Sequence, residues 1–358
     1  MILGASGNFG KRIAECLARD RTPIILAGRN RVKLERLEKL LGNSSSSIAC
    51  FDAFTELGDQ LKALKPSVVI NTCGPFQSGD YSIAKACLSQ RVHYIDLADG
   101  RDFVTGISSL DSQARERGVS IISGASTVPG LSSAVLDHYK DAFASIETLE
   151  YGISPGQRAE RGLATTQGIL SYVGKPLKEF PNERHKVYGW QGIHRVQYPD
   201  LSNRWMANCD IPDLDLFPQH YDIKSIRFSA GLELGFLHLG LWALSWLVRM
   251  GTPIKLENHA AALLKASNWF NQLGSQNGGM HVVLQGRDQS GEPITRKWFI
   301  IAYDGHGPYI PTIPAINLAK RLARQQLNLP GAYPCIGLVT LDDYLDELKD
   351  FNVKTFTN

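Results

Sequence analysis

Residues 1–10 read Met1-Ile2-Leu3-Gly4-Ala5-Ser6-Gly7-Asn8-Phe9-Gly10, a glycine-rich run between an apolar start and a stretch with helical spacing. Gly4 suits the tight turn after a strand, Gly7 lets the backbone approach a phosphate, and Gly10 lets the next helix pack on the sheet. The amide groups and the dipole of a helix start also favour an anion. We therefore predict that one segment binds a dinucleotide pyrophosphate: Gly4, Ala5, Ser6, Gly7, Asn8, Phe9 and Gly10.

The strand before this run is short. Only Met1, Ile2 and Leu3 precede Gly4, whereas strands usually contain about five or six residues. Either the first strand is unusually short, or the sequence begins slightly inside it. An incomplete strand would leave the glycine loop looser than its sequence suggests.

Strand and helix patterns alternate through the first half of the chain. Short apolar runs predict strands at 23–27, 48–51, 67–72, 93–97 and 119–123. Helical spacing of apolar residues predicts the helices between them, among them 11–19, 32–41 and 81–90. This alternation is typical of a parallel, doubly wound sheet, so we predict an α/β Rossmann-type domain at 1–140.

The alternation stops near residue 147. Longer strands are predicted at 148–154, 185–196, 225–231, 280–287 and 295–303. Runs of strands with few helices favour an α+β domain with a mostly antiparallel sheet, which we place at 141–310 as a substrate or dimerisation domain. The C-terminal helix and tail, 311–358, are expected to return to the Rossmann domain.

Composition narrows the class of protein. The chain has 358 residues, 43% of them hydrophobic and 20% charged, and a net charge of +3, which is too small to indicate a nucleic-acid partner. Its six cysteines contain no closely spaced pair, so we expect reduced thiols of a cytoplasmic protein, with no disulfide framework and no metal site. No charged-then-apolar leader opens the sequence, and we expect no secretion signal.

The end of the second predicted strand indicates which nicotinamide cofactor is bound. An NAD site places an acidic residue about 20 residues beyond the glycines, to hold the ribose 2′-hydroxyl. Here the residues are Gly28-Arg29-Asn30, with no acid beside them. Arg29 is suited to a 2′-phosphate, with Arg31 or Lys33 as auxiliary charge, so we predict NADP. The alternative is that these positively charged residues are simply solvent-exposed residues at the start of the next helix and bind no phosphate. Asp52, at the end of the third strand, is expected near the adenine.

Two further stretches have competing interpretations. Tyr81 and Lys85 match the Tyr-x-x-x-Lys pair of short-chain dehydrogenases, but they follow the fourth predicted strand rather than the fifth, which favours coincidence. Residues 234–248 are nearly all apolar but shorter than the roughly 20 residues of a membrane span. We expect this stretch to be buried in the core or in a dimer contact, with peripheral membrane contact as the alternative.

Several motifs together resemble the saccharopine dehydrogenase-like family, including its bacterial members without an assigned substrate. They are Gly-Ala-Ser-Gly-Asn-Phe-Gly at 4–10, Leu-Ala-Gly-Arg-Asn at 26–30, Asn-Thr-Cys-Gly-Pro-Phe at 71–76, His-Tyr-Ile-Asp-Leu at 93–97 and Gly-Ala-Ser-Thr-Val-Pro-Gly at 124–130. The resemblance implies a Rossmann domain, an α+β second domain and nicotinamide-dependent chemistry on imines or secondary amines. Relatives include enoyl reductases of lipid pathways.

The resemblance also implies site residues. Arg29 and Asn30 would join the glycines at the cofactor, and the nicotinamide would be lined by Cys73, Gly74, Pro75 and Phe76. Asp96 matches a Tyr-x-Asp position near the substrate and is the first candidate for proton transfer, with Tyr81 as the second. Independently of the resemblance, three polar residues are predicted to bind substrate: Asp99, Arg204 and His306. Arg204, next to Trp205, would clamp a substrate carboxylate, with a surface ion pair as the alternative, and His306 lies in a glycine-rich loop.

These observations predict an NADP(H)-dependent oxidoreductase that transfers hydride to or from an imine, a secondary amine or a related carbonyl. Its partners would be a small-molecule substrate and a second copy in a homodimer. Two other functions remain open: a short-chain-type or enoyl reductase acting on a lipid-like substrate, and a non-catalytic NADP-binding sensor or interaction protein.

Overall fold

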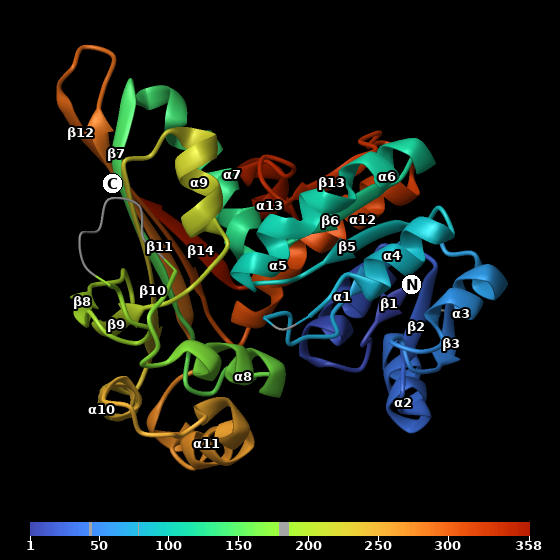
Figure 1. Cartoon of the computed structure of the whole chain (residues 1–358), viewed down its shortest axis with the longest axis horizontal. Helices are drawn as coiled ribbons and strands as arrows, with labels where there is room; N and C mark the ends of the chain where they lie inside the picture. Colours follow the sequence, from blue (N-terminus) through green and yellow to red (C-terminus); the bar gives the residue numbers. More distant parts are fainter. Residues whose placement is uncertain (43–44, 78, 179–185) are drawn as a thin grey trace. The chain divides into compact units, whose positions relative to one another are not determined.

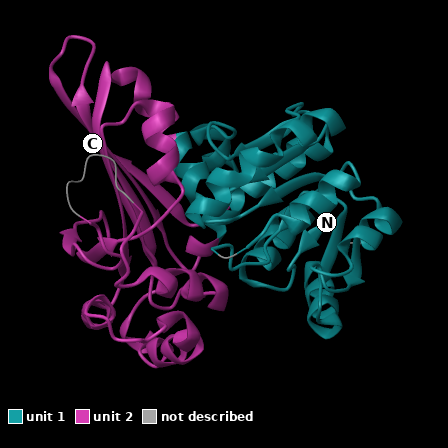
Figure 2. Ribbon diagram, in the orientation of Figure 1, with its two compact units in different colours: residues 1–134, 309–347 teal, residues 135–308, 348–358 magenta. Residues whose placement is uncertain are grey.

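The computed structural model describes residues 1–42, 45–77, 79–178 and 186–358 (Figure 1). The chain divides into two compact units (Figure 2). Unit 1 consists of residues 1–134 and 309–347, and unit 2 of residues 135–308 and 348–358. Each unit contains one seven-stranded sheet, sheet A in unit 1 and sheet B in unit 2. Both units are therefore assembled from segments that are far apart in sequence.

Sheet A is parallel throughout. Its strands, in spatial order, are β13 (Gly331–Pro334), β6 (Ser120–Ser123), β5 (His93–Asp96), β4 (Val68–Asn71), β1 (Ile2–Leu3), β2 (Ile24–Gly28) and β3 (Ser46–Cys50). The order reverses between β1 and β4, which is the topological switch point of a Rossmann-type sheet. The predicted fold class is confirmed.

Helices cover both faces of sheet A, which explains why its central strands are continuously apolar. On one face α1 (Asn8–Arg19) packs beside α2 (Arg31–Leu41) and α12 (Ile313–Ala323). On the other face a large core cluster joins the sheet to α3 (Leu57–Leu64), α4 (Ser82–Ser89) and α6 (Asp111–Arg117). The short helices α5 (Arg101–Thr105) and α13 (Leu341–Leu348) complete the unit, and α7 (Ser132–Tyr139) crosses into unit 2.

Sheet B is mixed and mostly antiparallel, as predicted. Its strands, in spatial order, are β14 (Val353–Thr357), β12 (Pro293–Ala302), β11 (Gly278–Arg287), β7 (Ser145–Ser154), β10 (Ser225–Leu232), β9 (Arg204–Asn208) and β8 (His194–Val196). Only β7 and β10 run parallel among these neighbours. The predicted strand 185–196 begins outside the described residues, and within the rest of it the strand is limited to β8.

The helices of unit 2 are α8 (Leu163–Tyr172), α9 (Asp213–Tyr221), α10 (Gly235–Arg249) and α11 (Ala260–Asn268). Helix α10 contains the apolar stretch that we expected in the core or in a dimer contact; the core of this chain does not enclose it, and the dimer contact stays a prediction. Its buried residues are the two polar ones, His238 and Ser245, whereas Phe236 and Leu247 are exposed. The reason is that neighbouring segments cover only one side of the helix. Among the described residues, no helix combines the length and apolarity needed to cross a membrane.

The last strand differs from the prediction for 311–358. Helix α12 and strand β13 belong to unit 1, but β14 pairs with β12 at the edge of sheet B. The pairing includes reciprocal backbone hydrogen bonds between Lys297 and Asn358, 2.9 and 3.0 Å long. The edge of β12 offers a row of backbone donors and acceptors, and the tail satisfies them.

Candidate cofactor and active site

The glycine run forms the predicted strand–turn–helix. Strand β1 ends at Leu3, and Gly4 has a φ of +74°, a conformation that side chains other than glycine rarely adopt. The Gly7 amide donates to the Gly4 carbonyl across 2.8 Å, and α1 begins at Asn8. A Cβ on Gly4 would lie only 2.7 Å from Thr72 Oγ1, whose hydroxyl donates to the Leu3 carbonyl at 2.8 Å. The turn is therefore locked against the end of β4.

A cavity of about 340 Å³ opens beside this turn, at the carboxyl ends of β1, β2, β3 and β4. This is where open α/β sheets bind their ligands. Eight predicted cofactor residues line it: Gly4, Ser6, Gly7, Arg29, Asn30, Asp52, Cys73 and Gly74. The other lining residues are Leu3, Ala27, Gly28, Lys33, Phe51, Ala53, Phe54 and Thr72.

The remaining predicted cofactor residues support this cavity rather than line it. Ala5 is fully buried, and Asn8 and Phe9 form the first turn of α1. Gly10 lies so close to the turn that a Cβ there would meet the Gly4 carbonyl oxygen and come within 2.8 Å of Ala5 Cα. Two more belong to the loop after β4: Pro75, and Phe76, whose ring packs on Phe103 at 5.3 Å.

Positive charge collects at the end of β2. The Arg29 side chain is 80% exposed, and its Nη1 lies 3.9 Å from Asp52 Oδ2. Asn30 caps α2 by accepting a hydrogen bond of 3.0 Å from the Lys33 amide, and Lys33 also lines the cavity. A surface ion pair at this distance contributes little, so Arg29 is available to a ligand anion. Two cations and a helix start at one cavity wall suit a phosphate.

Phe54 lines the cavity and was missed from the sequence. Its side chain is 64% exposed, and its amide donates to Asp52 Oδ1 across 3.0 Å. An aromatic ring held open to solvent beside a nucleotide cavity offers a flat surface on which a base can stack. The available signal was an aromatic residue two positions after the acidic residue at the end of a strand.

Cys73 has no character of a reactive thiol. Burial raises its pKa to about 11, with the nearby Arg29 charge acting in the opposite direction. The side chain is half-buried, and the Cys73 amide donates to Asn71 Oδ1 across 3.0 Å. A thiol protonated at neutral pH does not act as a nucleophile, so Cys73 shapes the cavity without reacting in it.

Asp96 is fully buried and does not line the cavity. Its Oδ1 accepts three hydrogen bonds of 2.9 Å, from the amides of Ala98 and Gly124 and from the Ser123 hydroxyl. These bonds join the end of β5 to the loop after β6, while Oδ2 is buried without a partner. The contacts describe a residue that positions loops, and its predicted part in proton transfer stays a prediction.

Asp96→Asn should change the pH dependence of stability. Burial raises the Asp96 pKa from 3.8 to about 6, so between these values the folded state holds more protons than the unfolded state. Stability therefore falls as pH rises through this window, by about 3 kcal/mol in total. Asparagine keeps an acceptor oxygen and does not ionise. Urea unfolding of both proteins across the window should show the wild type losing stability relative to the variant; a pH-independent difference would contradict this.

The Tyr81 side chain forms its contacts outside the cavity. Its hydroxyl donates to the Phe103 carbonyl across 2.7 Å, and the two rings pack 4.8 Å apart. Burial raises the Tyr81 pKa, whereas a short-chain dehydrogenase needs it lowered. Asp99 is partly buried and accepts a 2.9 Å hydrogen bond from Gln77 Nε2, and burial raises its pKa. Neither residue lines the cavity.

The two candidates in unit 2 have partners within that unit. Arg204 is 1% exposed, and its Nη2 forms an ion pair with Glu233 Oε1 at 3.3 Å. The carboxylate that we expected from a substrate is thus supplied by the chain. His306 Nδ1 accepts a 2.8 Å hydrogen bond from the Asn352 amide, and its ring packs on Phe351. Their roles in substrate binding stay predictions.

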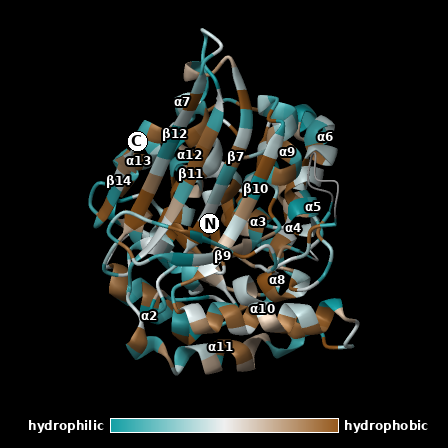
Figure 3. Ribbon diagram, turned by 90° about the vertical axis from the view of Figure 1, so that its left-hand side faces the viewer, coloured by the Kyte–Doolittle hydropathy of each residue, from teal (hydrophilic) through white to brown (hydrophobic). Residues whose placement is uncertain are grey.

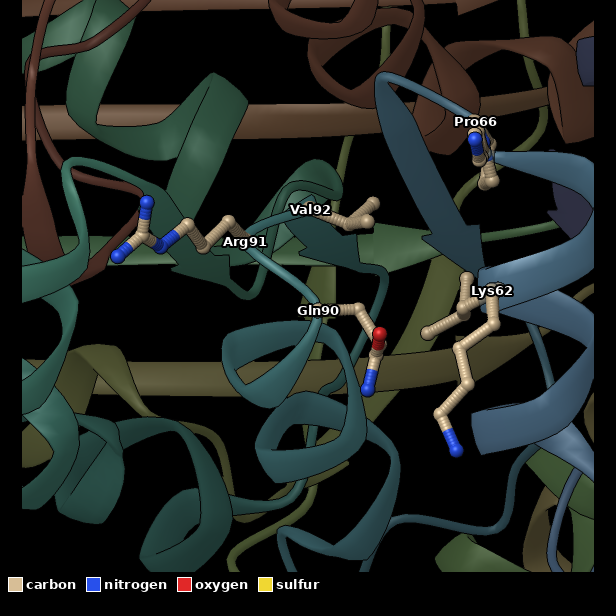
Figure 4. A pocket seen from close by; sticks show the side chains of 7 residues that line it. Lys62, Pro66, Gln90, Arg91 and Val92 are labelled. Carbon is tan, nitrogen blue, oxygen red and sulfur yellow. The ribbon is translucent and has the colours of Figure 1, made fainter.

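Unit 1 has another hollow, of about 480 Å³, where α3 and α4 end and β4 and β5 begin. Figure 4 shows the Arg91 side chain directed away from Gln90 and Lys62. Lys62 Nζ is paired with Asp59 Oδ1 at 3.2 Å. This edge lies opposite the strand ends that carry the glycine turn.

In the described part of the chain, no group of three or more His, Cys, Asp or Glu residues is arranged to hold a metal.

Comparisons with known proteins agree with this geometry. Residues 1–166 match the model of the saccharopine dehydrogenase NADP binding domain. A putative trans-acting enoyl reductase of Mycobacterium tuberculosis is 31% identical over 34% of this chain and 30% of its own length. A human saccharopine dehydrogenase-like oxidoreductase is 32% identical over 36% of this chain and 34% of its own length. The matched region thus spans about a third of these relatives.

The fold is also that of a solved structure. Apo saccharopine dehydrogenase (L-Glu forming) from Saccharomyces cerevisiae superposes with a TM-score of 0.69 over 100% of this chain and 99% of the yeast chain. At 13% identity this likeness concerns the fold alone. The predicted cofactor, NADP, agrees with the domain that matches residues 1–166. Residues 1–166, slightly less than half of the chain, are therefore a saccharopine dehydrogenase-type NADP-binding domain, and the human oxidoreductase supports the resemblance to the saccharopine dehydrogenase-like family.

Proposed function

We propose that this protein transfers hydride between NADP(H) and the carbon of an imine or secondary amine, or of a related carbonyl. The observation that carries the proposal is the cavity where the glycine turn, Arg29 and the end of β4 meet. The saccharopine dehydrogenase type of the matching domain supports imine and amine chemistry. The identified relatives support the oxidoreductase class.

The cavity residues fit the parts of the cofactor. The turn from Gly4 to Gly7 and the start of α1 would hold the pyrophosphate, because side chains at Gly4 would fill the cradle. Arg29 and Lys33 would hold the 2′-phosphate. Phe54 would stack on the adenine.

Cys73 and Gly74, at the end of β4, would lie along the nicotinamide. Bound NADPH supplies a hydride, and reduction of an imine to a secondary amine also needs one proton at nitrogen. The chain's task is to orient the two reactants and to deliver that proton. We retain Asp96 and Tyr81 as proposed proton donors, although their present contacts serve the fold.

Deuterium transfer tests this proposal. NADPH carrying deuterium at its hydride position is incubated with the protein and with imines formed from amino acids and 2-oxo acids. Mass spectrometry should find deuterium on the carbon of the secondary amine only when the protein is present. Unchanged transfer by Tyr81→Phe would exclude Tyr81 as proton donor and with it the short-chain interpretation, whereas loss of transfer would assign the proton to Tyr81. Tight NADPH binding without transfer to any imine would contradict the proposed chemistry.

Enoyl reduction is the second candidate. The observation that favours it is the 31% identity to the mycobacterial putative enoyl reductase over 127 residues. In the same experiment, an enoyl thioester would then acquire deuterium on its β-carbon while the imines stay unlabelled. Binding of NADPH with transfer to neither class would favour the non-catalytic sensor.

A further inference from the structure

A second cavity, of about 330 Å³, lies within unit 2 among α8, α10, α11 and the end of β10. Figure 3 shows hydrophobic residues spread along α10 and α11. The cavity walls are predominantly apolar and include Leu170, Trp190, Phe236, Leu241, Leu264 and Phe270. Leu170 and Trp190 are buried, while Phe236 is 51% exposed and packs against Phe270. The cavity therefore has a buried apolar part and a part open to solvent.

Arg161 is the one charged side chain among the described residues that line this cavity. Its Nη1 donates to Ser267 Oγ at 3.1 Å, and its Nη2 donates to the Gln157 carbonyl at 2.9 Å and to Asn268 Oδ1 at 3.5 Å. The buried Nε has no hydrogen-bond partner. All these acceptors are neutral, and no carboxylate in the described ranges forms an ion pair with Arg161.

The positive charge of Arg161 is therefore only partly compensated by neutral hydrogen-bond acceptors. Burial lowers the Arg161 pKa because the charged form loses hydration. An arginine nevertheless stays protonated at neutral pH, so its charge persists beside an apolar cavity. A ligand carboxylate at the guanidinium would supply the counter-ion and accept charge-assisted hydrogen bonds. An apolar chain attached to that carboxylate would fill the rest of the space.

We infer that this cavity binds a linear acyl chain with a terminal carboxylate, the chain among α8, α10 and α11 and the carboxylate at Arg161. The volume lies near the lower end of the roughly 300–1,000 Å³ range of small-molecule sites. Mostly apolar walls with one charged group are the composition expected of such a site. The assignment does not rest on the proposed hydride transfer, because every residue of the site belongs to unit 2.

Calorimetric titration of the full chain with decanoate and decanol tests the apolar part. Gly240 lines the cavity, and a Cβ there meets no atom within 4 Å, so Gly240→Leu would occupy open space and also favour the helix. We expect decanoate binding to weaken by about tenfold or more. Gly58→Leu in α3, where a Cβ also meets nothing within 4 Å, is the matched control and should bind as the wild type does. Should Gly240→Leu fail to fold, Ala266→Leu on α11 blocks the same cavity.

Arg161→Gln tests the charged part. Glutamine keeps a donor for Ser267 but removes the charge, so decanoate should bind about tenfold more weakly while decanol binding is unchanged. If Arg161→Gln weakened the binding of decanoate and of decanol equally, Arg161 would have a structural role only. Absence of decanoate binding to the wild type would overturn the inference. The inference would also be overturned if the protein bound only anionic phospholipid vesicles and if Gly240→Leu left that binding unchanged. That result would assign the apolar helices to a membrane surface.

Discussion

A Gly10→Ala variant is expected to lose NADPH binding and to unfold at a lower denaturant concentration than the wild type. The added Cβ would lie 2.8 Å from Ala5 Cα and 2.9 Å from the Gly4 carbonyl carbon. Both neighbours are backbone atoms, which cannot rotate away as a side chain can. Overpacking of this kind costs about 1–3 kcal/mol, and relief requires α1 to move away from the turn.

The measurements are NADPH titration by fluorescence and equilibrium unfolding in urea. Gly58→Ala is the control, because its Cβ meets no atom within 4 Å in α3. It should keep wild-type affinity and gain slightly in stability, since alanine is the better helix former. A Gly10→Ala protein with wild-type affinity for NADPH would show that the turn is not the pyrophosphate site.

An Arg29→Ala variant should bind NADPH about 10- to 100-fold more weakly and NADH almost as the wild type does. Charge-assisted hydrogen bonds to a phosphate are worth about 1.5–3 kcal/mol, which corresponds to that range. NADH lacks the 2′-phosphate and so loses nothing. The 3.9 Å pair with Asp52 is exposed, so its loss should leave stability nearly unchanged.

Arg31→Ala separates the specific effect of Arg29 from the effect of net charge. Arg31 follows two residues later, pairs with Glu35 at 3.6 Å and does not line the cavity. Its removal changes the protein charge equally but should alter NADPH affinity less than twofold. Equal losses in the two variants, or a parallel loss of NADH binding in Arg29→Ala, would refute the assignment of Arg29 to the 2′-phosphate.

The sequence predicted the structure around the candidate site well where that structure depends on local backbone geometry. The spacing of Gly4, Gly7 and Gly10 reports a turn whose atoms all lie within one short segment. Arg29 follows from the same logic, because the end of β2 always lies beside the glycine turn in this topology. Alternating strand and helix patterns then placed Cys73 and Gly74 at the same edge of sheet A.

The sequence was insufficient where the role of a polar residue depends on distant partners. The carboxylate next to Arg204 comes from Glu233, and the carbonyl that engages Tyr81 comes from Phe103. Neither partner follows a recognisable spacing. The motif around Asp96 predicts a proton donor, which stays a prediction, but it does not reveal that three hydrogen-bond donors contact one of its carboxylate oxygens.

Helix α10 shows that the sequence was also insufficient to predict which apolar residues are buried. Its hydrophobic content predicted burial, yet content does not tell which side neighbouring segments cover. The polar His238 and Ser245 face the interior, and apolar side chains line the cavity or remain exposed. Phe54 was overlooked for the converse reason, since one exposed aromatic residue in a loop carries no periodic signal.

The discontinuous make-up of both units has a consequence for synthesis on the ribosome. Strand β13 completes sheet A beside β6, and β14 completes sheet B beside β12; both are synthesised after the strands with which they pair. Until then, the edges of β6 and β12 carry unpaired backbone groups that can form hydrogen bonds with strands of other nascent chains. Neither sheet can therefore close until these late strands have left the ribosome, and chaperone protection of the two edges is most valuable in the interval before that.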